Sequence, residues 1–160
     1  MISLSFYIFW IGLTLVLYTY VGYGLLIYIF SAIKGRQKAP QIVANEELPE
    51  VTLLIAAYNE ERFIAAKIQN SLSLDYPPQK LNVWIVADGS TDQTVAIAQN
   101  FPAVKTFNLP ERKGKIHAVN RVMKLIKAPI VVFSDANTTL NSEALKNIVR
   151  HFQDKKVGGV

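Results

Sequence analysis

Four short apolar runs in the amino-acid sequence each end at a cluster of polar residues. They cover 51–57, 81–87, 104–107 and 130–133, and segments with apolar residues at helical spacing separate them. Such alternation is typical of an α/β fold, with a parallel sheet and right-handed crossover helices. Because the carboxyl ends of parallel strands meet at one edge, where open sheets bind ligands, we expect the binding site there.

The segments between and after these runs have the apolar spacing of helices. Their expected bounds are 60 to about 74, 95–100, 115–126 and 142–152. The sequence Ser90-Thr91-Asp92-Gln93 has the form of a capping box, which predicts that Ser90 caps the second helix. Asn141 or Ser142 is the expected cap of the fourth helix.

The chain begins with an uncharged apolar segment from Met1 to Ile33. A helix needs about 20 residues to cross a bilayer, so this segment is long enough to span one. It lacks the basic start and the small-residue cleavage site of a signal peptide. Lys34, Arg36 and Lys38 follow directly, and basic residues flank the cytoplasmic side of membrane spans. We therefore expect a single-pass transmembrane helix over 1–33, a basic and polar linker over 34–50, and a cytoplasmic soluble part.

Tyrosines and glycines gather in the second half of the apolar segment. They are Tyr18, Tyr20, Tyr23 and Tyr28, with Gly22 and Gly24. Small residues let helices approach closely and buried hydroxyls need partners, which favours partner helices in the membrane. An aromatic belt at the bilayer interface with a glycine kink fits the same residues equally well.

Composition and missing motifs narrow the function classes. The net charge of +5 comes with basic clusters that have local explanations, and no basic face with interleaved aromatics is visible, so we expect no nucleic-acid partner. The absence of cysteine excludes disulfides and thiolate zinc sites. Residues 58–62 lack the glycines of a dinucleotide site, and Gly114-Lys115 lacks the upstream glycine of a P-loop.

Two residues that follow the first two runs are suited to binding a nucleobase. Asp88 opens a turn, where its carboxylate can accept the N–H of a uracil-like base; the alternative is a cap for the next helix. Because we expect Ser90 to supply that cap, we favour base binding. Tyr58 offers a ring on which a base can stack, and a tyrosine at the edge of the core is an equal alternative.

The polar residues near the later runs are suited to a metal and a phosphate. Asp135 and Asn137 lie two apart after a strand end, and oxygen ligands of this kind suit Mg²⁺ or Mn²⁺. An Asx turn is the alternative. Arg112, Lys113 and Lys115 precede an expected helix start, a combination that suits anions such as phosphate. We favour phosphate contact for Lys115, and a solvated basic loop for Arg112 and Lys113.

From about Val51 onward, the chain resembles membrane-associated family 2 glycosyltransferases with a GT-A fold. Four motifs in order carry the resemblance: Ile55–Glu61, Val86–Asp92, Lys113-Gly114-Lys115 with Ala118-Val119-Asn120, and Phe133–Thr138. The resemblance implies inverting transfer of a sugar from a nucleoside diphosphate sugar, with a UDP-sugar favoured. It also implies a divalent metal as cofactor and a polysaccharide or lipid-linked acceptor.

The resemblance assigns roles to site residues by motif position. These are Tyr58, Glu60 and Asp88 for the nucleoside, Lys115 for the diphosphate with Asp135 beside it, and Asp135 and Asn137 for the metal. Asn137 stands where the family has a second Asp, so the site carries less negative charge than usual. Ala87 also departs from members with a second acidic residue before the Asp88 position.

In the family, the general base and the acceptor-binding segment follow this region, and no residue here matches them. We therefore interpret 51–160 as the nucleotide-sugar-binding half of the domain, with no catalytic residue of its own and little turnover alone. The final residues 157–160 suggest the start of a strand, as in a truncated chain. A non-catalytic nucleotide-binding or partner-binding membrane module is the alternative. A nucleotidyltransferase is disfavoured, because the Gly-rich, Arg-containing phosphate loop is missing after the first run.

Overall fold

The computed structural model describes residues 3–35, 40 and 44–160. The chain forms two compact units, Met1–Ala39 and Pro40–Val160, which are described separately.

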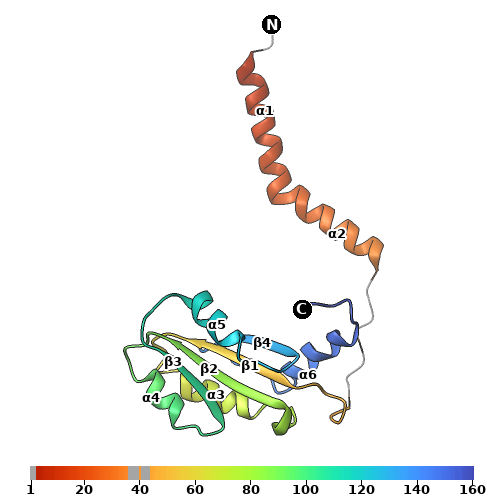
Figure 1. The fold of residues 1–160 in the computed structure, drawn as a ribbon. Coiled ribbons are helices and arrows are strands. Elements are labelled where there is room, and N and C mark those ends of the chain that lie inside the picture. The colour runs from red at the N-terminus through yellow and green to blue at the C-terminus, as the bar shows by residue number, and fades with distance from the viewer. Residues whose placement is uncertain (1–2, 36–39, 41–43) are drawn as a thin grey trace. The chain divides into compact units, whose positions relative to one another are not determined.

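The first unit is helical. Helix α1 (Leu4–Leu17) and helix α2 (Tyr23–Lys34) are joined by a π-helical segment, Tyr18–Gly22. Together they make 31 residues, Leu4–Lys34, a length and composition sufficient to cross a membrane. Figure 1 shows a change of direction between α1 and α2, and π-helical turns are a known cause of such bends. The π-helical segment ends at Gly22, in agreement with the glycine-kink interpretation, while partner helices stay a prediction.

The predicted linker 34–50 is described in part, because residues 36–39 and 41–43 lie outside the described residues. Leu48 is buried, with 2% of its surface exposed, and packs in the core of the second unit. The second unit thus begins before residue 50.

The second unit contains a four-stranded parallel sheet in the order β3-β2-β1-β4. Its strands are β1 (Val51–Ala57), β2 (Leu81–Asp88), β3 (Val104–Leu109) and β4 (Ile130–Asp135). Each begins at the predicted residue, and the last three run further than the apolar pattern indicates. Ala57 pairs with Ala87 and Ala56 with Asp135, so the polar clusters after β1, β2 and β4 share one edge. The α/β prediction is confirmed.

Helices cover both faces of the sheet (Figure 1). They are α3 (Ile64–Leu72), α4 (Thr94–Gln99), α5 (Lys115–Met123) and α6 (Ala144–Val149), with short 3-10 turns at Pro78–Lys80 and Arg150–Gln153. Residues of α3, α4 and α6 pack on one face against β-strand residues such as Leu53 and Ile85. Helix α5 packs on the other face against Leu54 and Val86.

Several predicted helix features are wrong. The first helix begins at Ile64 rather than residue 60, and the apolar residues Phe63 and Leu72 near its two ends are 52% and 43% exposed. Gln93, not Ser90, occupies the N-cap position of α4. Glu143 replaces Asn141 or Ser142 at the start of α6, without a side-chain cap. Residues 157–160 form no strand.

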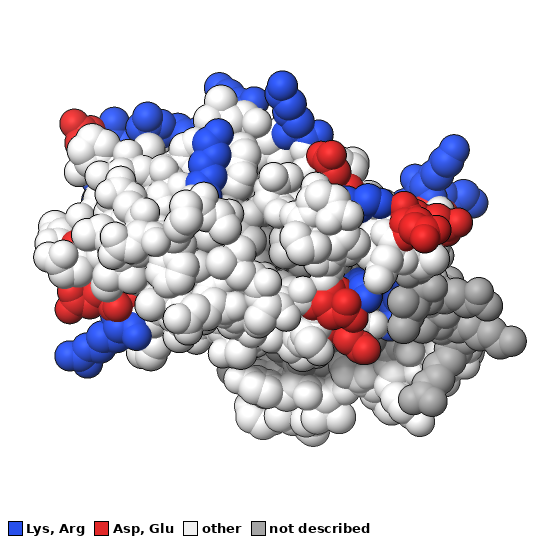
Figure 2. Space-filling view, turned by 90° about the horizontal axis from the view of Figure 1, so that it is seen from below, with Lys and Arg blue, Asp and Glu red and all other residues white. Residues whose placement is uncertain are grey.

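Charged side chains are distributed in small groups on the face that is lower in Figure 1. Figure 2 shows Lys and Arg groups beside Asp and Glu groups, with uncharged side chains covering most of the surface between them. On the described part of this face, the positive net charge is therefore not collected in one area.

Candidate functional site

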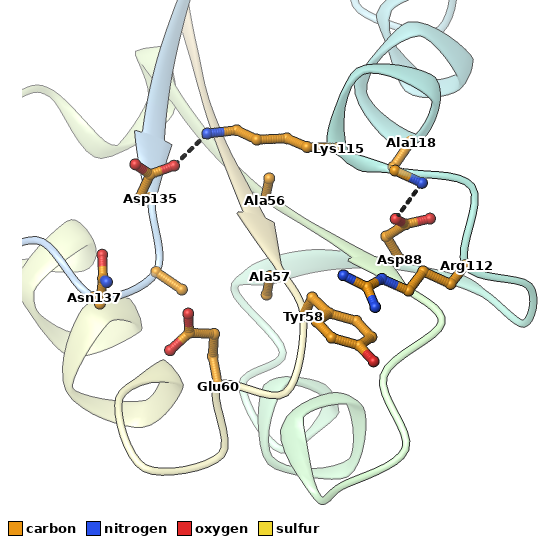
Figure 3. A pocket seen from close by; sticks show the side chains of 12 residues that line it. Ala56, Ala57, Tyr58, Glu60, Asp88, Arg112, Lys115, Ala118, Asp135 and Asn137 are labelled. Atoms are coloured by element: carbon orange, nitrogen blue, oxygen red, sulfur yellow. Dashed lines mark hydrogen bonds and ion pairs between the residues drawn. The ribbon is translucent and has the colours of Figure 1, made fainter.

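A cavity of about 340 Å³ lies at the edge where the carboxyl ends of the strands meet. The site residues predicted from the sequence all line it (Figure 3). The complete lining is Ala56, Ala57, Tyr58, Glu60, Asp88, Arg112, Gly114, Lys115, Ala118, Asp135, Ala136 and Asn137. The alanines keep the cavity open because their side chains are small.

The loops that follow β1 and β2 hold each other by reciprocal hydrogen bonds. The Asn59 amide N–H donates to Ser90 Oγ at 3.2 Å, and the Thr91 N–H donates to Asn59 Oδ1 at 2.9 Å. Asn59 adopts a φ of 54°, a left-handed conformation that asparagine tolerates better than most residues. Ser90 therefore binds the neighbouring loop instead of capping α4.

Glu61 and Asp92 add further hydrogen bonds between these two loops, and we call the whole set of bonds the clasp. The Glu61 N–H donates to Asp92 Oδ2 at 3.1 Å, and the Gln93 N–H donates to Glu61 Oε2 at 3.1 Å. The other Asp92 oxygen accepts the Thr94 N–H at 3.0 Å, just before α4. Burial alone would raise the pKa of Asp92, but the hydrogen bonds from Thr94 and Glu61 outweigh it and hold the pKa below its ordinary value. Asp92 thus has a structural role just before α4.

Tyr58 and Glu60 alternate with these structural residues and line the cavity. The Glu60 N–H is bound by Thr94 Oγ1 at 2.8 Å, which fixes its backbone while its carboxylate lies at the cavity (Figure 3). The residues of the clasp therefore bond to the neighbouring loop, while Tyr58 and Glu60 face the cavity.

Asp88 is engaged with the loop that precedes α5. Its side chain is buried, with 6% exposed, and its two carboxylate oxygens accept the N–H of Lys113 at 3.0 Å and of Gly114 at 2.8 Å. The prediction assumed a carboxylate left free by a Ser90 cap, and that premise is wrong. Each carboxylate oxygen nevertheless has a second lone pair, so Asp88 can hold the loop and accept a ligand N–H together.

Arg112 reaches the cavity from the same loop. Its guanidinium carbon lies 3.9 Å from the centre of the Tyr58 ring, a stacked cation–π contact. The backbone of Arg112 also packs tightly on Gly89, because a Cβ built there would lie 2.6 Å from the Arg112 nitrogen. The sequence placed Arg112 in a basic loop but gave no sign of this contact with Tyr58.

Lys115 and Asp135 form an ion pair across the cavity (Figure 3). Their side chains are 61% and 56% exposed, so the pair is accessible to an incoming ligand. In the described part of the chain, no three His, Cys, Asp or Glu side chains are close enough together to hold a metal ion. At the predicted metal position, the described residues offer the carboxylate of Asp135 and the amide oxygen of Asn137. This partial set of hard oxygen ligands fits Mg²⁺ or Mn²⁺ when phosphate oxygens supply the rest.

Lys67, which contacts the turn after β4, was not among the site residues predicted from the sequence. Only 2% of the residue is exposed, and its ammonium donates to Ser134 Oγ at 2.7 Å and to the Thr138 carbonyl at 2.9 Å. A signal was present, because Lys67 follows Ile64 by three residues and precedes Ser71 by four, which places it on the buried face of α3.

A parallel sheet with a cavity at its carboxyl edge, lined by an aromatic ring, cations and three carboxylates, defines an α/β domain suited to a nucleotide-like anionic ligand. The chain belongs to the glycosyltransferase family 2, because the sequence model described as "Glycosyl transferase family 2" matches residues 52–160. The family resemblance seen in the sequence is confirmed.

Two relatives illustrate the range of the similarity. A Beta-monoglucosyldiacylglycerol synthase from Nostoc sp. is 35% identical over 159 residues, which are 96% of this chain and 32% of the relative. A Poly-beta-1,6-N-acetyl-D-glucosamine synthase from Staphylococcus aureus is 32% identical over 127 residues, 77% of this chain and 30% of the relative. The chain thus spans about a third of the length of these curated relatives.

Solved structures give the same fold. The mannosyltransferase PcManGT from Pyrobaculum calidifontis, in complex with GDP-Man and Mn²⁺, has a TM-score of 0.69 and 31% identity over 83% of this chain and 41% of its own. The S. aureus TarS fragment 1–349, in complex with UDP-GlcNAc, has a TM-score of 0.59 and 26% identity over 66% of this chain and 31% of its own. The predicted GT-A-type fold is confirmed.

Proposed function

We propose that this chain is the donor-binding part of a membrane-anchored, inverting glycosyltransferase that uses a nucleoside diphosphate sugar to make a glycolipid or polysaccharide. The observation that carries the proposal is the convergence of Tyr58, Asp88, Lys115 and Asp135 on one cavity. Relatives named for glycolipid and polysaccharide synthesis support the product class.

The nucleobase would bind at the Tyr58 side of the cavity. Arg112 covers one face of the Tyr58 ring at 3.9 Å, so a flat base would stack on the opposite face of the ring or on the outer face of the guanidinium. Asp88 would accept a base N–H through its remaining lone pairs while holding the Lys113 and Gly114 amides. Glu60 would bind the ribose or base from the opposite loop.

The diphosphate would bind at the Lys115 side. Lys115 now neutralises Asp135, and an incoming diphosphate would draw its ammonium away. Asp135 and Asn137 would then hold Mg²⁺ or Mn²⁺ together with phosphate oxygens. The cation would supply positive charge to the diphosphate as it leaves the sugar.

The acceptor and the general base are assigned to no residue of this chain. Inversion requires a base near the attacking hydroxyl, so we expect the chain to bind donor without efficient sugar transfer. Helix Leu4–Lys34 would anchor the domain, and the basic residues after it would lie on the cytoplasmic side.

Calorimetry on the full chain in detergent tests the proposal with UDP and GDP in the presence of Mn²⁺. We expect binding of at least one of them by the wild type, and a loss of about tenfold or more in Asp88→Asn, because hydrogen bonds to charged groups contribute about 1.5–3 kcal/mol. Asp154→Asn, outside the cavity, is the control for removing a carboxylate. Equal affinity in Asp88→Asn and wild type would remove Asp88 from the site, and no binding by the wild type would refute the proposal.

A further inference from the structure

Lys67 is a buried lysine that the proposed mechanism does not use. Its ammonium has three N–H donors, and the structure supplies three acceptors. These are Ser134 Oγ at 2.7 Å, the Thr138 carbonyl at 2.9 Å and Thr138 Oγ1 at 3.2 Å. The hydrogen-bonding capacity of this side chain is therefore fully used by one turn.

That turn carries the proposed cation ligands. Ser134 and Thr138 stand on either side of Asp135 and Asn137, so Lys67 binds both ends of the segment that presents them. Thr138 Oγ1 also donates to the Asp135 carbonyl at 2.9 Å, which closes the turn upon itself. Lys67 thus supports the side chains of Asp135 and Asn137 indirectly, through its hydrogen bonds to both ends of the turn.

A second residue of α3 anchors the same loop further along. Asn70 Nδ2 donates to the Leu140 carbonyl at 2.9 Å, and the Leu140 N–H donates to Asn70 Oδ1 at 2.9 Å. The amide of Asn70 makes this contact without a charge. Attachment of the loop to α3 therefore does not by itself require a cation at position 67.

Stability alone gives a poor account of the lysine. Burial disfavours an ammonium and lowers the pKa of Lys67, while the negative charge of Asp135 opposes this effect in part. All three direct partners are neutral oxygens, and apolar groups of similar volume often replace buried charges without loss of stability. A buried cation beneath a turn that offers cation ligands therefore points to a role in the site.

We propose that Lys67 is a positioning residue that fixes the Ser134–Thr138 turn, so that Asp135 and Asn137 present their oxygens to a divalent cation bound with a nucleoside diphosphate. This inference rests on the proposed function. Removal of groups that orient metal ligands typically weakens metal binding by about 10- to 100-fold. Lys67 acts through the turn, so its loss affects the metal-dependent part of binding more than contacts with the base.

The test measures Mn²⁺ binding by electron paramagnetic resonance, with UDP or GDP present, on the full chain in detergent. Binding of the same nucleotide without metal is measured by calorimetry. In Lys67→Met, Mn²⁺ affinity should fall by about tenfold or more, with a smaller change in metal-free binding. Lys146→Met is the matched control, because Lys146 is also largely buried, at 12% side-chain exposure, but pairs with Asp75 outside the cavity.

Substitution of Thr138 tests the same contacts from the turn. Thr138→Val removes the hydroxyl at nearly constant shape and should weaken Mn²⁺ binding in the same direction, whereas Thr138→Ser retains the hydroxyl and should restore it. If Lys67→Met does not fold, the comparison of Thr138→Val with Thr138→Ser still tests the inference. If the wild type binds the nucleotide with Mn²⁺ and both Lys67→Met and Thr138→Val bind Mn²⁺ equally well, the inference is wrong while the proposed function stands. If the wild type binds no nucleotide, the proposed function and the inference fall together.

Discussion

Lys115 illustrates how single residues prepare the cavity for a ligand. In the free protein its ammonium neutralises Asp135, but both side chains are more than half exposed. Exposed ion pairs contribute little to stability, so the pair can open at small cost, as the proposed binding of a diphosphate requires. In the proposed function, the lysine would balance the charge of Asp135 until a ligand takes its place.

We expect Lys115→Met to weaken UDP or GDP binding by about tenfold, because a charge-assisted contact with phosphate is lost. Binding of uridine or guanosine, which lack phosphate, should change little. Calorimetry with the four ligands measures the difference. Lys113→Met is the control, since Lys113 lies in the same loop and pairs with Glu111 at 3.0 Å. An equal loss in both lysine variants would show a general charge effect instead.

Gly89 is a second residue whose identity the structure dictates. It has a φ of 68°, and a Cβ would lie 2.6 Å from the Arg112 backbone nitrogen. Gly114 also has a positive φ, of 91°, but a Cβ there would meet no atom within 4 Å. Alanine substitutions at the two glycines therefore distinguish the free energy lost through a positive φ from the free energy lost through a steric clash.

Both alanine variants should lose about 1–3 kcal/mol of stability, because each glycine has a positive φ that residues with a Cβ rarely adopt. Gly89→Ala should lose a further ~1–3 kcal/mol because the Arg112 loop must move. It should also disturb the stacking of Arg112 on Tyr58 and so reduce nucleotide affinity. Urea unfolding and calorimetry measure the two effects. Similar free energies of unfolding for the two variants would mean that the loop yields easily.

At the scale of elements, the sequence predicted the sheet better than the helix ends. Strand starts follow from local apolar runs, and all four match the structure. Helix starts depend on partners from elsewhere in the chain. Ser90 has the form of a cap, but it accepts the N–H of Asn59 in the loop after β1, a contact that no local pattern reveals.

The site shows the same difference between features that local sequence patterns predict and features that depend on contacts from elsewhere in the chain. The polar residues after each strand line one cavity because a parallel sheet brings strand ends together. The Arg112–Tyr58 contact and the burial of Lys67 each depend on packing between segments that are far apart in the sequence. No local pattern predicts such packing. Asp88 was assigned to the right edge, but its bonds to the Lys113 and Gly114 amides depend on such packing.

The clasp between the loops after β1 and β2 gives a prediction that reverses the capping-box expectation. Asp92→Ala should destabilise the chain by about 1 kcal/mol, because the carboxylate binds the N–H groups of both Thr94 and Glu61. Ser90→Ala should cost less, since Ser90 accepts one exposed N–H at 3.2 Å. Urea unfolding at neutral pH measures both. A larger cost for Ser90→Ala would restore Ser90 as the cap.

The pH dependence of the Asp92 contribution follows from its lowered pKa. A depressed carboxyl pKa stabilises the fold above the ordinary value of 3.8, and that stabilisation is lost as pH falls through the folded-state pKa. The difference between wild type and Asp92→Ala should therefore shrink in acid.

Tyr76 joins the segment before β1 to the loop after α3. It is buried, with 5% exposed, and its hydroxyl donates to the Pro49 carbonyl at 2.6 Å. Burial raises the pKa of Tyr76 to about 12. A raised pKa contributes stability that is complete below the unfolded value of about 10 and is lost as pH rises toward 12.

Tyr76→Phe should lower the free energy of unfolding by about 1 kcal/mol at neutral pH, through the lost hydrogen bond. Between about pH 10 and 12, the wild type should lose its advantage over the variant, since only the wild type must keep this phenol protonated. Denaturant unfolding across that range measures the difference between the two proteins. A constant difference would show that the phenol is already free to ionise in the folded chain.

At the scale of the whole molecule, the proposed membrane and binding functions belong to different units. Every described residue from Ser3 to Gly35 is exposed within this chain apart from the half-buried Gly22, as expected of a helix that meets lipid or partner helices. Every residue that lines the cavity belongs to the unit Pro40–Val160. The core beneath the cavity is likewise built from that unit, with Leu48 as its first described buried residue.

Residues 40–160 alone should therefore fold and bind the nucleotide with the affinity of the full chain. They should remain in solution with lipid vesicles, whereas the full chain should float with them, because the apolar helix Leu4–Lys34 is long enough to span the bilayer. Flotation in a density gradient and calorimetry on both proteins test the two halves of this prediction. Flotation of the short protein would place a membrane-binding surface on the soluble unit, and loss of its nucleotide binding would mean that the first unit supports the cavity.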